Sequence, residues 1–557
     1  MKAVNLLITY NHKDRIIKRY LHFIFNYYRS ELMFNKKTFL QVAVGAALAS
    51  TAMSSYATTD PSRPNILAIW GDDIGMDNLS AYTKGQAGHW TPNIDRIANE
   101  GVLFTDFYGE NSCTAGRSAF ITGQHPMRTG LTKVGMPGAT QGSRKEDPTI
   151  ATMLKHKGYM TGQFGKNHLG DLDEHLPTEH GFDEFFGNLY HLNAEEEPEH
   201  PDYPKGDAFK KQFGPRGVIH SYADGKIEDT GPLTRKRMET VDEEFLSAAL
   251  DFIDKAHKEK KPFFVWFNST RMHVWTHLKE ESKGLSQRGG IYGDGLVEHD
   301  NMVGELLDKL DELKIADNTI VSYTTDNGAE KLSWPDGGTV RFRGEKNSSW
   351  EGGHRVPAMM RWPGKIPAGS FANEMAAHND WAPMFLAAAG EKNIVAELKE
   401  GKTLNGTKYK VHLDGYNLLP ALETGKATTQ HNLASWPRKT YIYATDNGDI
   451  SAVRVGDYKV MFSVNNCHGL ETWNCAFDEL RAPKMYNLRQ DPYENADHEG
   501  QYTKWYIEHL PYMYLGAAST AQFLQTFQEF PPRQVPGSFS IDQIVEKMNI
   551  WQRAQYQ

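Results

Sequence analysis

Oxygen-bearing side chains in two short clusters could bind a hard cation. Asp72 and Asp73 directly follow one apolar run of the chain, and Asp326 and Asn327 follow another. Carboxylate and amide oxygens suit Ca²⁺ or Mg²⁺, whereas Zn²⁺ prefers His and Cys. Adjacent carboxylates repel each other unless a cation or hydrogen-bond donors hold them. Taken alone, Asp72-Asp73 is better explained as a helix cap followed by a solvated acid.

Cys113 is a second candidate for chemistry. It lies in the string NSCTAGR, so that Cys-x-Ala-x-Arg places a thiol near a possible helix start and Arg117 one turn further on. A lone cysteine is usually an ordinary buried residue. The string by itself therefore predicts no activity.

The elements that position these residues follow from hydrophobic patterning. Buried strands are predicted for the apolar runs at 64–70, 158–165, 262–268 and 318–325. Helical patterns alternate with them at 93–101, 149–158, 242–258 and 296–314. This alternation predicts an α/β sheet with helices on both faces. In such sheets, ligands bind at the carboxyl ends of strands, which is where Lys166, His168 and His273 also fall.

Two later parts of the chain have a different pattern. Residues 192–235 are rich in Pro, Gly and charge and predict a surface insertion that lines a substrate entrance, with a hairpin near 220–224. Residues 440–464 alternate apolar and polar residues and predict an antiparallel meander. We therefore expect a catalytic domain over 58–435 and a smaller α+β domain with an antiparallel sheet over 436–557.

The N-terminal 57 residues have the features of a leader. A charge-free run at 39–53 is preceded by two lysines and followed by Ser-Tyr-Ala, which is typical of a secretory signal peptide. The run is too short and too rich in Ala and Ser for a membrane span. Starting at Met33 gives a signal peptide over 33–57, and residues 1–32 are then a doubtful upstream extension. The expected location is a bacterial periplasm.

Composition excludes other classes of protein. The chain of 557 residues has 61 basic and 70 acidic residues, a net charge of −9, which argues against nucleic-acid binding. Of the three cysteines, Cys467 and Cys475 lie eight residues apart, and a short-loop disulfide is expected in an oxidising compartment. A metal knuckle with His468 is the less favoured alternative, because four zinc-type ligands are not in evidence.

The candidate residues lie in segments that resemble type I, formylglycine-dependent sulfatases of the alkaline phosphatase superfamily, most closely bacterial periplasmic arylsulfatases. The segments follow the family's order from residue 63 to about residue 496. They are PNILAIWGDDIG, CTAGRS with ITGQHPMRTG, GYMTGQFGKNHLG, PFFVWFNSTRMH, SYTTDNGAE, RGEKNSSWEGGHRVPAMMRWPG and MYNLRQDPYENAD. The resemblance implies a large, mixed, mostly parallel sheet sandwiched by helices and the hydrolysis of sulfate esters, of the aryl sulfate type.

The resemblance also implies how each residue would act. Cys113 would be oxidised to formylglycine, whose hydrate supplies the nucleophilic oxygen. One divalent cation, Ca²⁺ in preference to Mg²⁺, would be held by Asp72, Asp73, Asp326, Asn327 and modified residue 113. Arg117 would hold the diol, Lys166 and Lys346 would bind the sulfate, His168 would be the base, and His273 would serve the leaving oxygen.

The sequence also indicates which partners the protein would have and which other functions it could have. Ala115 stands where many family members have Pro, which points to a sulfatase-maturating enzyme of the radical type. The substrate would be a small-molecule or glycan sulfate ester, with Trp275 and His277 near the leaving group. The alternatives are a phosphonate or phosphate ester hydrolase of the same superfamily and a non-catalytic protein that binds sulfated glycans. Three residues are expected to be structural (His125, Arg128, Glu351), and the repeated string at 445–448 is expected to be a hairpin turn.

Overall fold

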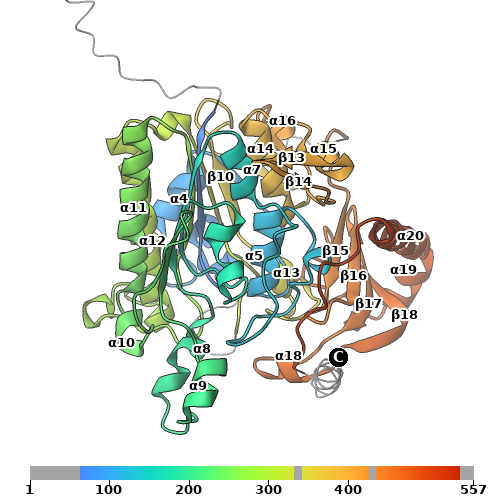
Figure 1. Cartoon of the computed structure of the whole chain (residues 1–557). Helices are drawn as coiled ribbons and strands as arrows, with labels where there is room; N and C mark the ends of the chain where they lie inside the picture. The colour runs from blue at the N-terminus through green and yellow to red at the C-terminus, as the bar shows by residue number, and fades with distance from the viewer. Residues whose placement is uncertain (1–62, 332–340, 426–433, 540–557) are drawn as a thin grey trace, which may run out of the picture. The chain divides into compact units, whose positions relative to one another are not determined.

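A ten-stranded mixed sheet is the centre of the fold (Figure 1). The structure is a computed structural model that describes residues 63–331, 341–425 and 434–539. The strand order is β11(Ser370–Ala372)-β2(Val102–Phe104)-β10(Ala358–Arg361)-β9(Thr319–Thr324)-β1(Asn65–Trp70)-β8(Phe263–Asn268)-β4(Met160–Gly165)-β5(Glu184–Gly187)-β6(Ile219–Tyr222)-β7(Ile227–Asp229). The four predicted strands are β1, β4, β8 and β9, and they pair with one another in parallel as neighbours. The predicted fold class is confirmed.

Successive side chains of β1 point to opposite faces of the sheet and so into two different hydrophobic cores. Ile66, Ala68 and Trp70 face one core, whereas Leu67 and Ile69 face the other. The second core is covered by α4 (Pro92–Asn99), α11 (Val241–Glu259) and α12 (Gly290–Glu312). The first is covered by α5 (Cys113–Thr122), α7 (Ile150–His156) and α14 (Trp381–Ala388). Figure 1 shows these two helical layers on opposite sides of the sheet. Both faces of the central strands are therefore buried, as their near-continuous apolar runs require.

The segment 192–235 carries more regular structure than a loop. It contains α8 (Leu192–Glu196), α9 (Asp207–Phe213) and the pair β6–β7. The predicted hairpin is thus present, and its strands extend the edge of the large sheet by pairing β6 with β5.

A four-stranded antiparallel sheet occupies the C-terminal part. Its order is β15(Thr440–Ala444)-β16(Ile450–Val455)-β17(Tyr458–Val464)-β18(Asp478–Asn487), so the predicted meander is confirmed. One face packs against the larger part of the chain, where Tyr441 stacks on Tyr108 with ring centroids 4.5 Å apart. Helices α19 (Tyr502–Glu508) and α20 (Pro511–Gln525) lie on the other face.

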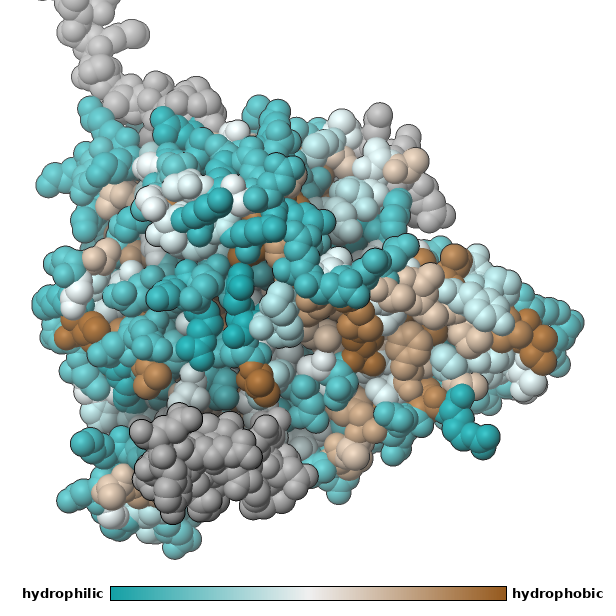
Figure 2. Space-filling model, turned by 45° about the vertical axis from the view of Figure 1, so that its right-hand side comes forward, coloured by the Kyte–Doolittle hydropathy of each residue, from teal (hydrophilic) through white to brown (hydrophobic). Residues whose placement is uncertain are grey.

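The surface of this C-terminal part is less polar than that of the large sheet's helices. Figure 2 shows it with more brown and pale side chains than the mostly teal remainder of the visible face. Exposed apolar residues on α19 and α20 include Ile507, Tyr514 and Leu515.

Some predictions fall beyond the described residues. The leader over 1–57 is one of them, and it stays a prediction, as does the domain boundary at 435. The described residues belong to one compact unit. Among the described helices, none is long and apolar enough to cross a membrane.

Candidate active site

Cys113 is the first residue of α5 and is 1% exposed. Its thiol lies near the carboxyl edge of the large sheet, where β1, β4, β8 and β9 end. Burial raises the pKa of this thiol far above its ordinary value. A protonated thiol is a weak nucleophile. The position is therefore central to the site, while the unmodified side chain is unsuited to nucleophilic attack.

Three carboxylates surround this residue. Asp72 and Asp73 follow β1, Asp326 follows β9, and ligand atoms of these three and of Cys113 all lie within 4.8 Å of one another. All three carboxylates are buried. Burial opposes ionisation of Asp73, but Lys346 and His273 hold its pKa down at about 2.

Asn327 completes a donor set for a hard cation. Its Nδ2 donates to Asp73 Oδ1 at 2.7 Å. Its Oδ1 is buried and has no hydrogen-bond partner among the described residues. An unpaired buried carbonyl oxygen beside three carboxylates fits a cation that prefers oxygen ligands. The residues present thus fit one Ca²⁺ or Mg²⁺.

Arg117 fixes the geometry of the acidic cluster. Its guanidinium is fully buried and bonds Asp326 Oδ2 through Nε at 3.2 Å and reaches Asp72 Oδ1 through a terminal nitrogen at 3.4 Å. The other terminal nitrogen donates to the carbonyl of Lys166 and to Asn268 Oδ1. The fixed fork of donors therefore ties together residues at the carboxyl ends of four strands, β1, β4, β8 and β9.

Two lysines bring positive charge to the cluster. Lys166 Nζ lies 2.6 Å from Asp72 Oδ2, and Lys346 Nζ lies 2.9 Å from both Asp73 Oδ2 and Glu330 Oε2. Burial disfavours the charge on Lys346, but Asp73 raises its pKa well above the ordinary value. Both lysines are therefore cations held by carboxylates.

The backbone selects the tautomers of two histidines. His168 donates from Nε2 to the carbonyl of Gly135, so its buried Nδ1 carries the lone pair and has no partner among the described residues. His273 donates from Nδ1 to the carbonyl of Val274, which leaves its Nε2 3.6 Å from Asp73 Oδ2. Burial and Lys166 lower both pKa values, that of His273 to about 3. Each neutral ring thus offers a lone pair to the site.

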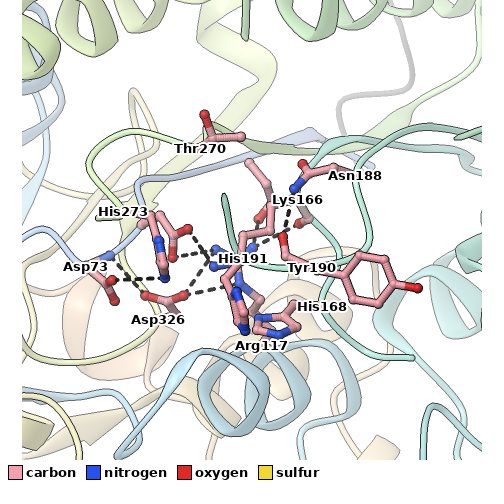
Figure 3. A network of polar contacts seen from close by, with 12 residues as sticks. Asp73, Arg117, Lys166, His168, Asn188, Tyr190, His191, Thr270, His273 and Asp326 are labelled. Atoms are coloured by element: carbon pink, nitrogen blue, oxygen red, sulfur yellow. Dashed lines mark hydrogen bonds and ion pairs between the residues drawn. The ribbon is translucent and has the colours of Figure 1, made fainter. Parts of the chain in front are cut away.

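His191 is a site residue that sequence reasoning missed. It follows β5 in the segment 188–191, packs against His168 with ring centroids 5.3 Å apart, and stacks on His273 at 5.8 Å (Figure 3). The same strand-end rule, applied to the short apolar run at 185–187, would have found it.

A pocket of about 300 Å³ opens over this cluster. Cys113, His191, His273 and Lys346 line its polar end, together with Glu330. The remaining wall is mainly apolar and includes Trp275, Leu470, Trp473 and Phe539. Leu470 and Trp473 come from the C-terminal part, which the sequence did not connect with the site.

That C-terminal wall is closed by a disulfide. Cys467 and Cys475 are bonded to each other, so the pair prediction is confirmed and the metal knuckle is excluded. The one-turn helix α18 (Glu471–Asn474) lies between them. Cys113 is the free cysteine among the described residues.

Of the other residues singled out from the sequence, some line the pocket and others make contacts elsewhere in the fold. Trp275 lines the pocket, but His277 is outside the pocket lining and pairs with Glu196 at 2.6 Å. Asp446 of the repeated string pairs with Lys133 in a turn after β15. The three residues expected to be structural form buried contacts outside the pocket lining: His125 caps α6 (Pro126–Thr129), Arg128 pairs with Asp414, and Glu351 pairs with Lys459.

Four of the ten non-glycine residues with positive φ in the described part of the chain lie at or beside this site. Asp73, His168, Trp275 and Asn347 have φ values between 58° and 65°, in the left-handed region that non-glycine residues rarely adopt. Such residues persist where surrounding structure over-determines them and often belong to functional sites.

Comparisons with known proteins agree with the geometry. The family model described as Sulfatase matches residues 64–391. The chain is 32% identical over 447 residues to N-acetylgalactosamine-6-sulfatase of Canis lupus familiaris, covering 78% of this chain and 77% of that protein. It is 33% identical over 452 residues to arylsulfatase A of Homo sapiens, covering 78% and 82%. The crystal structure of PsFucS1 sulfatase from Pseudoalteromonas sp. superposes with a TM-score of 0.74 at 27% identity, covering 90% of this chain and 97% of that one.

Proposed function

Because this chain belongs to the sulfatase family and is a sulfuric ester hydrolase, we propose that it hydrolyses its ester with a formylglycine made from Cys113 and one divalent cation. The observation that carries this proposal is the placement of a buried, protonated thiol within 4.8 Å of three carboxylates. Thiol chemistry is disfavoured there, whereas an oxygen nucleophile beside a cation is favoured.

The charges support a cation. Three carboxylates (Asp72, Asp73, Asp326) are matched by three cations (Arg117, Lys166, Lys346) through ion pairs, and Glu330 also pairs with Lys346. A divalent cation held by the three carboxylates, Asn327 and residue 113 would polarise the sulfate and favour an ionised nucleophile, Ca²⁺ in preference to Mg²⁺. The resulting excess of positive charge suits an anionic ester.

Each residue of the site would then have its own role in the reaction. One oxygen of the hydrated aldehyde at residue 113 would attack sulfur and displace the alcohol or phenol. Deprotonation of the second oxygen would then re-form the C=O bond, break the C–O bond to sulfate and so release sulfate with the aldehyde restored. Arg117 orients residue 113, and Lys166 and Lys346 bind sulfate oxygens. His168 accepts a proton at Nδ1, its free lone pair. His273 must first gain a proton at Nε2, beside Asp73, before it can donate to the leaving oxygen.

The pocket wall supports a leaving group with an apolar ring face. Trp473, Leu470 and Phe539 border the space above Cys113. Aromatic side chains stack on aryl rings and present apolar surface to sugar rings. The names of the relatives, arylsulfatase A and N-acetylgalactosamine-6-sulfatase, include both kinds of ester.

Ala115 and the disulfide support proposals on how the protein is matured and where it is located. We propose that a sulfatase-maturating enzyme of the radical type oxidises Cys113, because Ala115 follows it at the second position. The disulfide between Cys467 and Cys475 supports an oxidising compartment such as the periplasm, reached with the leader at 33–57.

Mass spectrometry of the tryptic peptide 97–117, from protein matured in its native host, tests the nucleophile. We expect an aldehyde at residue 113, and an intact thiol in active protein would overturn the proposal. Cys113→Ala should abolish hydrolysis of 4-nitrophenyl sulfate. Assaying 4-nitrophenyl phosphate and a phenyl phosphonate ester side by side tests the alternative hydrolases, and turnover of the sulfate itself excludes a purely glycan-binding protein.

A further inference from the structure

We propose that His191 is a neutral hydrogen-bond donor that binds an oxygen of the sulfate group in the substrate. The inference rests on the proposed function, because it places the sulfate beside residue 113. It adds a third histidine to the pair His168 and His273 and assigns it a role that neither of them can fill.

The tautomer of His191 is set by the backbone. His191 is the N-cap of α8, and its Nδ1 accepts a hydrogen bond from the amide of Ala194 at 3.1 Å. Because an accepting Nδ1 carries the lone pair, the ring proton of a neutral His191 lies on Nε2. Burial and the nearby His273 lower its pKa well below the ordinary value, which keeps the ring neutral.

The two neighbouring histidines have the opposite arrangement. His168 and His273 both donate to backbone carbonyls and present lone pairs to the site. Among the histidines of this group, His191 is the one whose neutral form directs an N–H away from the backbone. A sulfate oxygen can only accept, so only this ring binds it without first gaining a proton.

The present partner of that N–H is weak. His191 Nε2 lies 3.4 Å from the thioether sulfur of Met136, and both residues line the pocket above Cys113. A thioether is a poor acceptor compared with an anionic sulfate oxygen. His191 is 6% exposed and contacts the rings of both histidines assigned to the reaction. An anion bound in the pocket above Cys113 would compete with Met136 for this N–H.

Two substitutions distinguish the proposed role of His191 as a hydrogen-bond donor from its role as the N-cap of α8. His191→Asn keeps a side-chain oxygen that can cap α8, since Asn is a preferred N-cap residue, but loses Nε2–H. His191→Gln extends an amide N–H toward the position of Nε2 but caps poorly. His125→Asn is the matched control, because His125 also caps a helix through Nδ1 and lies outside the pocket lining.

The experiment measures steady-state hydrolysis of 4-nitrophenyl sulfate, inhibition by inorganic sulfate, thermal unfolding and aldehyde content for each variant. His191→Asn should raise KM and the inhibition constant of sulfate by about tenfold or more, the range of a hydrogen bond to a charged group. Its unfolding midpoint should remain near wild type, His191→Gln should recover part of the sulfate affinity, and His125→Asn should change neither constant.

Unchanged KM and sulfate inhibition in His191→Asn, with full aldehyde content, would overturn the role of His191 alone. A loss in His191→Asn that is matched by a fall in its unfolding midpoint would also overturn it, since the residue would then be structural. Wild-type protein that is active without the aldehyde would instead overturn the proposed nucleophile, and sulfate binding by the unmodified protein would still test His191.

Discussion

The side-chain amide of Asn347 donates a 3.0 Å hydrogen bond to the carbonyl oxygen of Thr472. This bond ties the residue after the pocket lysine, Lys346, to the segment closed by the disulfide between Cys467 and Cys475. The C-terminal part therefore contributes directly to the pocket, and its wall is held in register with Lys346, the residue proposed to bind sulfate.

Asn347→Gly tests this connection without adding strain, because glycine tolerates the φ of 65° found at this position. We expect KM for 4-nitrophenyl sulfate to rise by about threefold to tenfold, the effect of one lost hydrogen bond. Asn347→Ala should have the same kinetic effect and lower stability by a further 1 kcal/mol or so, because its Cβ disfavours the left-handed region. Equal kinetics for Asn347→Gly and wild type would show that the bond does not position the wall.

Removing the disulfide should destabilise the same wall. The cysteines are eight residues apart, and loop-closure entropy for so short a loop corresponds to about 2.5 kcal/mol. We expect the double variant Cys467→Ser/Cys475→Ser to unfold at a lower temperature by calorimetry and to have a raised KM for bulky esters. A double variant with wild-type stability and KM would show that the hydrogen bond from Asn347 to Thr472 suffices to hold the wall.

Trp473 should select the leaving group. Its ring lines the pocket and lies 6.0 Å from Lys346 Nζ. Trp473→Ala should raise KM for aryl sulfates by about tenfold, the scale of a lost aromatic contact of about 1.5 kcal/mol, and leave inhibition by inorganic sulfate unchanged. Trp90→Ala, at an exposed tryptophan outside the pocket lining, is the control. A parallel loss of sulfate inhibition in Trp473→Ala would contradict a leaving-group role.

Chelation should abolish activity and calcium should restore it. The cation would supply several kcal/mol of charge stabilisation, so treatment with EGTA or EDTA should lower kcat/KM by at least about a hundredfold. Asp326→Asn should do the same. Asp446→Asn is a matched control, because Asp446 lies in the same Thr-Asp-Asn-Gly string but pairs with Lys133. Full activity after exhaustive chelation, with no metal detected by elemental analysis, would exclude the cation.

Buried neutral histidines should make the fold sensitive to acid. Burial lowers the pKa of His180 from 6.5 to about 4. The unfolded chain therefore binds more protons than the fold between pH 6.5 and 4, and stability falls as pH falls through this window, by up to about 1.4 kcal/mol per pH unit. His180→Gln should flatten this dependence in denaturant titrations at several pH values. An unchanged slope would show that His180 does not titrate in this way.

The sequence alone determined the strands, the helices between them and the edge at which ligands bind. Apolar runs of strand length can be buried only inside a sheet covered on both faces, and parallel neighbours must end at the same edge. Ten of the residues named from sequence meet there, including Asp72, Cys113 and Lys346.

Only the tertiary structure decided the remaining features. The tautomers of His168, His191 and His273 depend on hydrogen bonds to backbone groups elsewhere in the fold, which no local pattern encodes. The wall carrying Trp473 reaches the pocket through contacts between segments more than 100 residues apart. Residue types and spacing specify local structure and strand ends, whereas the direction of a proton or the approach of a distant loop is set by long-range packing.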